Sequence, residues 1–281
     1  MPYEAEISRA NPTCFLFLID QSGSMADSFG DAEDARSKAQ ALADDVNKLL
    51  QNLCIRCARA EGVRDYFNVG VIGFGGNGVG PVFGGVLAGR DLVPISEVAN
   101  SPARIEERTK KSDDGAGGLV SQAVKFPIWF DPVAVNGTPM CQALAYATKV
   151  LRTFVSDHPA CFPPVVMHLT DGEATDGDPT ENMKEITSVA SADGNVLLFN
   201  VHISSRKDKP IAFPEVLGQL SVDQYARLMF EAASELTPRM RDVAVEHGFQ
   251  LGTGAKAYTF NADNVLVIQA LDIGTRPSDL R

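Results

Sequence analysis

The first long apolar run of the chain covers six consecutive residues, 14–19, and ends abruptly at Asp20. Because apolar and polar positions do not alternate in it, the run predicts a strand covered on both faces, as in a parallel sheet. Apolar residues then recur at helical spacing over 34–60, and a second run, rich in β-branched residues, covers 67–74. A strand, a helix and a strand within about 60 residues predict a βαβ unit of a parallel sheet.

The same alternation continues along the rest of the chain. Further strands are predicted over 164–170, 195–203 and 256–260. Helical periodicity predicts helices over 140–155, 180–192, 223–236, 238–248 and 263–271. This order of elements is typical of an α/β protein.

The stretch between the second strand and residue 130 is the least regular. Its glycine-rich part, 73–89, contains a G-x-G-x-x-G pattern, but no helical pattern follows it. A hairpin leading into a short strand over 82–87 is therefore favoured over a phosphate-binding loop. Residues 91–130 are interpreted as an insertion beside the sheet, in which the mixed-charge run 104–111 (RIEERTKK) predicts a solvated helix face. The proline-broken segment 126–135 is typical of an extended covering segment.

Composition narrows the class of protein. The 281 residues are 44% hydrophobic and 22% charged, values typical of a globular protein, and their number suits one α/β unit with insertions. A formal net charge of -11 argues against a nucleic-acid partner, which needs a basic surface. No apolar run approaches the roughly 20 residues that span a bilayer, and residues 1–12 lack the apolar core of a signal peptide. We therefore expect a cytoplasmic protein without a membrane partner.

Five cysteines, an odd number, do not suggest a disulfide framework. Cys54 and Cys57 have the C-x-x-C spacing of a redox pair or of half a zinc site, but they lie inside a predicted helix and no second pair exists. Reduced, structural thiols are therefore the favoured interpretation. His168 and His202 lie in strand-like runs and are expected to be packed core groups.

The candidate chemistry begins where the first strand ends. Asp20 is followed by hydroxyls at alternate positions, Ser22 and Ser24. The carboxyl ends of the strands are where open α/β sheets place their ligands. Carboxylate and hydroxyl oxygens are hard donors that suit a hard divalent cation such as Mg²⁺. An ordinary polar turn uses the same residue types, so the rest of the chain has to decide between the two interpretations.

A second strand, 164–170, also ends in an acid, Asp171. Because parallel strands present their carboxyl ends at the same edge, Asp20 and Asp171 are expected to converge on one crevice. Thr138 precedes Pro139 at the predicted start of the 140–155 helix. Its hydroxyl either caps that helix or faces a metal ion at the same edge.

Taken together, these residues resemble the metal-ion-dependent adhesion site of the von Willebrand factor type A (vWA) family. Asp20-x-Ser22-x-Ser24 is similar to the family's D-x-S-x-S signature, and Thr138 and Asp171 correspond to its separate threonine and later aspartate. The match covers 13–275, with the insertion at about 91–130, and leaves 1–12 as an N-terminal extension and 276–281 as a C-terminal tail. The resemblance implies a doubly wound, Rossmann-like α/β fold. Helices would cover both faces of a mostly parallel sheet, with one antiparallel edge strand at 82–87.

The resemblance also implies what the site does. In that family's pattern Ser22, Ser24 and Thr138 coordinate the ion directly, whereas Asp20 and Asp171 ligate it directly or through water. The ion is expected to be Mg²⁺, with Mn²⁺ or Ca²⁺ as alternatives. An open coordination position would accept an Asp or Glu carboxylate of a partner protein. The implied function is a metal-dependent protein–protein interaction module, with no catalytic residues and no organic cofactor.

Within the family the chain is most similar to bacterial tellurite-resistance proteins of the TerY type. The segments that carry this closer resemblance are 20–25, 169–173 and 260–263. It implies a stress-response or signalling complex with a kinase and a phosphatase. An adaptor for an AAA+ ATPase of the MoxR or chelatase type is the alternative. A metal-dependent phosphoesterase is disfavoured, because the sequence shows no base near the two serines, no P-loop and no G-x-S-x-G elbow.

Overall fold

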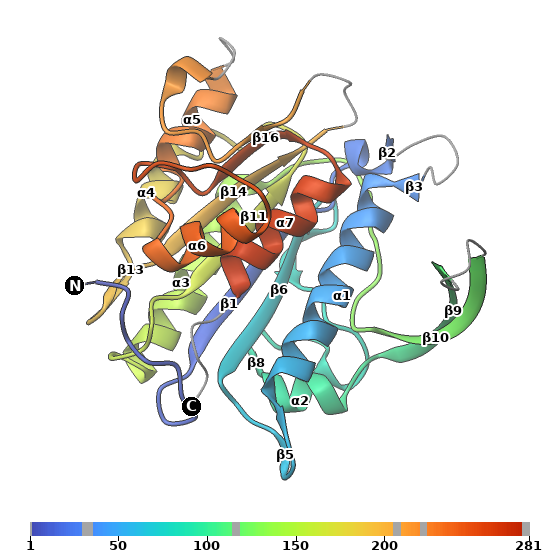
Figure 1. Ribbon diagram of the computed structural model, residues 1–281. Helices are drawn as coiled ribbons and strands as arrows, with labels where there is room; N and C mark the ends of the chain where they lie inside the picture. The colour runs from blue at the N-terminus through green and yellow to red at the C-terminus, as the bar shows by residue number, and fades with distance from the viewer. Residues whose placement is uncertain (1, 30–35, 114–118, 205–208, 220–223, 277–281) are drawn as a thin grey trace.

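The computed structural model describes residues 2–29, 36–113, 119–204, 209–219 and 224–276. Its centre is an eight-stranded sheet in the order β15-β16-β14-β11-β1-β6-β7, with β8 also paired to β6 (Figure 1). The parallel strands are β1 (Thr13–Asp20), β6 (Phe67–Gly75), β11 (Val165–Thr170), β14 (Leu197–Ile203) and β16 (Tyr258–Ala262). The antiparallel strands at the edges are β7 (Gly78–Pro81), β8 (Val93–Pro94) and β15 (Ile211–Ala212). The predicted α/β fold with a mostly parallel sheet is confirmed.

Helices cover both faces of this sheet (Figure 1). One face carries α1 (Lys38–Cys57), α2 (Ile95–Asn100), α6 (Pro238–Glu246) and α7 (Asn264–Thr275). The other face carries α3 (Met140–Asp157), α4 (Thr180–Ser188) and α5 (Gln224–Ala232). Because the sheet is buried on both sides, its central strands are apolar at most positions.

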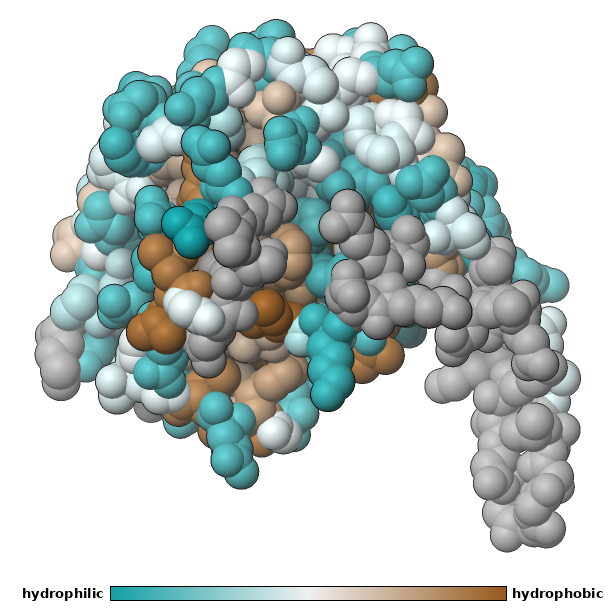
Figure 2. Space-filling view, turned by 90° about the horizontal axis from the view of Figure 1, so that it is seen from above, coloured by the Kyte–Doolittle hydropathy of each residue, from teal (hydrophilic) through white to brown (hydrophobic). Residues whose placement is uncertain are grey.

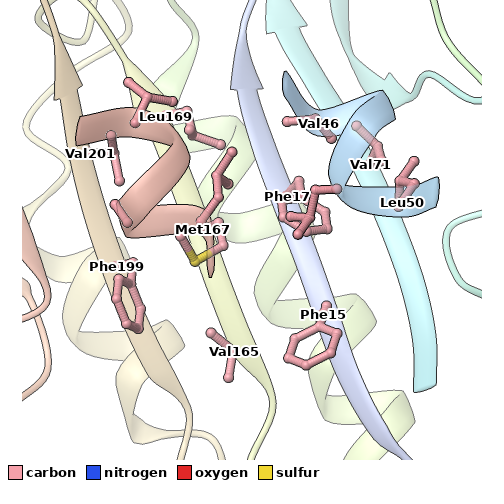
Figure 3. Packing of buried hydrophobic residues seen from close by; sticks show 14 of the residues in the cluster. Phe15, Phe17, Val46, Leu50, Val71, Val165, Met167, Leu169, Phe199 and Val201 are labelled. Carbon is pink, nitrogen blue, oxygen red and sulfur yellow. The ribbon is translucent and has the colours of Figure 1, made fainter. Parts of the chain in front are cut away.

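Strand β1 shows this pattern directly. Phe15, Phe17 and Ile19 belong to the core beneath α1 and α7, part of which Figure 3 shows. The intervening residues Cys14, Leu16 and Leu18 belong to the core beneath α3 and α4. The unbroken apolar run therefore supplies two cores at once, and Asp20 marks the point where both end.

Two predictions about the edge and the insertion were wrong. Three antiparallel strands, not one, lie at the edges, and the one that follows β6 is β7, not 82–87, because Gly78 with φ 100° lets the chain turn back at once after β6. Residues 85–87 instead form a 3-10 turn. The charged run 104–111 is not a helix, because it lies in strand β9 (Arg104–Asp113), which pairs antiparallel with β10 (Leu119–Ile128). The two strands form a ribbon that projects from the body (Figure 1).

The charges of β9 follow strand spacing. Arg104 and Arg108 both bond Glu106, which lies two residues from each on the same side of the strand. Arg108 also reaches Asp44 of α1 at 2.9 Å and lies 3.9 Å from the ring centroid of Phe126 on β10. These contacts across the ribbon and to the body favour the strand over a solvated helix.

The remaining elements agree in type and differ at their ends. Helix α1 is shorter than the predicted 34–60 and begins after Ser37, whose hydroxyl accepts a hydrogen bond from the Gln40 amide. Helices α4 and α5 each end four residues early, whereas α7 extends four residues further than predicted. No helix among the described residues has the length and apolarity needed to cross a membrane.

The cysteines and His168 also fit their predicted places, whereas the predicted burial of His202 in the core is met only in part. All five thiols are free, and Cys54 and Cys57 lie in α1, where burial raises the pKa of each thiol to about 12. His168 is fully buried, and its ring Nδ1 lies 3.0 Å from the Asn200 side-chain oxygen. Burial lowers the pKa of His168 to about 4, so it is a neutral core group. His202 is half-buried and stacks on Phe260.

Candidate functional site

The candidate site lies where strands β1 and β11 end. The two strands are parallel neighbours with Ile19 opposite Leu169, so Asp20 and Thr170 end them side by side and Asp171 follows at once. The predicted convergence of the two acids on one edge of the sheet is therefore present. The face that carries this edge is mostly hydrophilic, with hydrophobic residues gathered near its middle (Figure 2).

Asp20 is fully buried at this edge. One carboxylate oxygen accepts a hydrogen bond from the Ser22 amide at 2.8 Å, and the other accepts one from the Thr170 hydroxyl at 2.6 Å. Burial raises the pKa of Asp20, and the nearby charge of Asp171 raises it further, although these hydrogen bonds act in the opposite direction. The fold therefore holds Asp20 in a fixed place where its negative charge is poorly solvated.

The two serines and the second acid form a continuous chain of hydrogen bonds. The Ser24 hydroxyl donates to Asp171 Oδ1 at 2.8 Å, and the Ser22 and Ser24 hydroxyl oxygens lie 3.0 Å apart. The Ser22 hydroxyl also interacts with the Asp20 carboxylate, and either serine can be the donor in the contact between the two hydroxyls. Lone pairs of both serine oxygens remain available at the end of β1.

A lysine that the sequence did not single out belongs to this network. The ammonium of Lys38, the first residue of α1, lies 2.8 Å from Asp171 Oδ2. It also lies 3.4 Å from Asp27 Oδ2 and 3.5 Å from the Ser24 carbonyl oxygen. The Lys38 and Asp171 side chains are only 7% and 0% exposed. A signal was present, because Lys38 precedes Leu42 and Val46 at spacings of four and so falls on the buried face of the helix.

Thr138 lies in an adjoining loop and does not cap α3. The helix begins at Met140, and its amides at Cys141 and Gln142 are each bound at 3.0 Å by the Asp176 carboxylate. Of the two alternatives for Thr138, the capping role is therefore excluded, because a side chain from another loop binds these amides. Thr138 itself is buried.

Close contacts fix the Thr138 loop against the rest of the site. The Thr138 amide donates to the Thr175 hydroxyl at 2.9 Å, and the Thr175 amide donates to the Thr138 carbonyl at 3.0 Å. On the other side, a Cβ added to Gly23 would lie 2.2 Å from the Asn136 side-chain oxygen. The loops after β1, before α3 and after β11 thus meet at one place. Asp20, Ser22, Ser24 and Asp171 are joined with Thr170 and Lys38 into one network, and Thr138 is a neighbour of that network.

Tyr225 of α5 is a further residue that sequence patterns did not reveal. Its hydroxyl lies 3.5 Å from the Met140 sulfur and interacts with Thr170. Burial raises the pKa of Tyr225, and the charge of Asp20 adds to the effect. Thr170 therefore contacts both Asp20 and Tyr225, and Tyr225 lies outside every motif noted in the sequence.

The donor set fits a hard divalent cation in chemistry. It consists of carboxylate and hydroxyl oxygens, which Mg²⁺ prefers, and it offers neither sulfur nor imidazole. Among the described residues there is no group of three or more His, Cys, Asp or Glu side chains placed to hold a metal. An ion here would therefore depend on serine and threonine hydroxyls together with two carboxylates. The positive charge of Lys38 lies next to one of those carboxylates.

Comparisons with known proteins do not assign the chain to a family. No protein-family model matches it, and no curated protein matches its sequence. The structure of the three N-terminal domains of the type V pili tip protein Mfa5 from Porphyromonas gingivalis aligns with 58% of this chain at 11% identity and a TM-score of 0.31. This chain covers 20% of that one. An uncharacterized membrane spanning protein from Vibrio fischeri aligns over 68% of this chain and 71% of its own, at 17% identity and a TM-score of 0.28.

Proposed function

We propose that this chain is a metal-dependent binding module of the vWA type, which holds Mg²⁺ at the carboxyl edge of its sheet and binds an acidic side chain of a partner protein. The observation that carries the proposal is the hydrogen-bonded series Ser22–Ser24–Asp171 beside the buried Asp20. An ordinary polar turn after a strand does not explain the full burial of Asp20. The carboxyl ends of the strands are also where open α/β sheets place their ligands, which supports a cation site here.

The residues of the proposed metal site have different roles. Ser22 and Ser24 present hydroxyl oxygens, and Asp171 orients the Ser24 hydroxyl by accepting its hydrogen. Asp20 has both oxygens held by protein donors, so it supplies negative charge and leaves the inner positions to water or hydroxyls. Thr138 adds a third hydroxyl from the adjoining loop.

The charge balance favours an anionic partner. The Asp20 and Asp171 carboxylates and the Lys38 ammonium sum to a single negative charge. When bound, Mg²⁺ would supply two positive charges and an open coordination position that a partner carboxylate can fill. The loaded site would then carry a net positive charge in a poorly solvated place, where an acidic side chain is a favourable ligand.

The resemblance of 20–25, 169–173 and 260–263 to the TerY type supports a kinase and phosphatase complex as the biological setting. An AAA+ ATPase is the alternative partner. The genes adjacent to this one separate the two settings, because a motor protein would be encoded as a separate polypeptide.

Isothermal titration of Mg²⁺ tests the proposal. Wild type should bind one ion, and Asp20→Ala and Ser22→Ala should lose that binding. Asp157→Asn is the matched control, because this exposed carboxylate ends α3 at the opposite edge of the sheet and should leave binding unchanged. Equal binding by wild type and Asp20→Ala would sink the proposal.

A peptide array tests the second part of the proposal, the binding of an acidic side chain through the ion. Each acidic peptide is paired with the same peptide carrying Asn or Gln at the acidic position. Binding should require Mg²⁺, should be abolished by EDTA, and should be confined to the acidic member of each pair. Peptides that bind equally well with and without Mg²⁺ would contradict a carboxylate held through the ion.

A further inference from the structure

Lys38 occupies an unusual place for a lysine. It is the first residue of α1, and the positive end of the helix dipole disfavours a cation there. The side chain is nonetheless only 7% exposed, and its closest partner is the Asp171 carboxylate at 2.8 Å. Lysine is rarely buried without a paired acid. The burial of Lys38 is therefore explained by its pairing with Asp171, which lies outside the helix.

We infer that Lys38 is a resident counter-ion, which neutralises Asp171 in the ion-free protein and competes with the divalent cation for that carboxylate. This inference rests on the proposed metal-binding function. It assigns to Lys38 the role of setting how tightly the site binds its ion. The site would hold Mg²⁺ more weakly than its oxygen donors alone allow.

Asp27 provides the place to which the ammonium moves. Its carboxylate lies 3.4 Å from the same lysine nitrogen, and its side chain is 63% exposed. A lysine ammonium is a point charge on a flexible stem, so a small shift lets it exchange one carboxylate for the other. Moving toward Asp27 releases Asp171 Oδ2 toward the ion and keeps the ammonium paired. The same shift increases the distance between the Lys38 ammonium and the bound cation.

Titration of Mg²⁺ into two Lys38 variants tests the competition. Lys38→Met removes the charge and keeps much of the length, and it should bind Mg²⁺ at least about tenfold more tightly than wild type, because a like charge has been removed from a poorly solvated site. Lys38→Arg keeps the charge and should stay close to wild type. Lys48→Met, an exposed position on the same helix, is the control and should not change the affinity.

A double-mutant cycle tests the role of Asp27. Asp27→Asn should weaken Mg²⁺ binding in the wild-type background, because the displaced ammonium loses its second acceptor. In the Lys38→Met background the same change should have a much smaller effect. Because Asp27 is mostly exposed, Asp27→Asn alone should fold and remain informative. If Lys38→Met fails to fold without its charge, Lys38→Gln replaces it in the cycle.

The outcomes separate this inference from the proposed function. If wild type binds Mg²⁺ through Asp20 but Lys38→Met binds no more tightly, the counter-ion role is overturned and the metal site stands. If Asp27→Asn has equal effects with and without Lys38, the exchange between the two carboxylates is overturned. If neither wild type nor any variant binds Mg²⁺ at millimolar concentrations, both proposals fall. Binding that is detectable only in Lys38→Met supports the counter-ion role in its strongest form.

Discussion

The ammonium of Lys38 lies 2.8 Å from a carboxylate oxygen of Asp171, and solvent reaches neither side chain to any extent. The pair joins the first turn of α1 to the loop that follows β11, across 133 residues of sequence. Lys38 therefore balances the charge of Asp171 even without an ion, whereas Asp20 has no such counter-ion in the network described above.

Breaking this pair should be costly in the absence of metal. Asp171→Ala leaves the Lys38 ammonium buried without its main partner, and the free energy of unfolding should fall by about 3 kcal/mol. Urea denaturation in EDTA measures the loss. The control is Glu181→Ala, which breaks the exposed pair with Lys184 and should leave the free energy of unfolding nearly unchanged. Similar losses in the two variants would show that the Lys38–Asp171 pair is effectively solvated.

The site also depends on a close approach of backbones beside it. A Cβ added at Gly76 would lie 1.9 Å from the Asn136 carbonyl oxygen, so the loop that carries Thr138 would have to move. We expect Gly76→Ala to lower the free energy of unfolding by about 1–3 kcal/mol and to weaken Mg²⁺ binding. In the same hairpin, Gly80→Ala meets no atom within 4 Å and should be nearly neutral in both measurements. Unchanged Mg²⁺ affinity in Gly76→Ala would remove the Thr138 loop from the site.

The fold was largely predictable because its central strands are covered on both faces. Such strands are mostly apolar, so a continuous run such as 14–19 has few alternative interpretations. The insertion was not predictable in the same way. Its charges alternate at spacings of two and of four, which suit a strand as well as a helix, and the contact of Arg108 with Asp44 that favours the strand is a tertiary one.

The candidate site was predictable only where its residues directly follow strands. Asp20 and Asp171 could be brought together from sequence because parallel strands end at one edge. The spacing of Lys38 from Leu42 and Val46 places it on the buried face of its helix, but its pairing with Asp171 could not be predicted, because it depends on how α1 packs. The same holds for Tyr225, which reaches the site from a helix distant in sequence.

The C-x-x-C pair should be chemically inert in the native protein. Burial raises the pKa of both the Cys54 and the Cys57 thiol to about 12, so the reactive thiolate is scarce at neutral pH. Titration with a thiol reagent should modify at most Cys141, the least buried cysteine, and that slowly, because burial raises its pKa to about 11. All five thiols should react in guanidinium chloride. Rapid native modification of Cys54 or Cys57 would show that α1 opens readily.

The pH dependence of the free energy of unfolding should reveal the unfavourable burial of the Asp20 charge. Its pKa is raised in the folded protein, mainly by burial, so the folded state binds the proton more tightly than the unfolded chain. The resulting stabilisation is present at low pH and is lost as the pH rises through the folded-state pKa. In EDTA at pH 7, Asp20→Asn should therefore be more stable than wild type, and the difference should shrink as the pH falls toward 4.

Asp272 of α7 provides the opposite case for the same experiment. Burial alone would raise its pKa, but hydrogen bonds from Arg276, His247 and Arg56 together lower it to about 2. Asp272→Asn should therefore be less stable than wild type at pH 7, and the difference should narrow as the pH falls toward 2. Thermal unfolding of the three proteins across this pH range measures both effects.

Added Mg²⁺ should stabilise wild type and Asp272→Asn but not Asp20→Asn, because only the last lacks the buried charge that the ion needs. If Asp20→Asn is less stable than wild type at pH 7 in EDTA, the claim that the buried Asp20 charge destabilises the ion-free protein is contradicted.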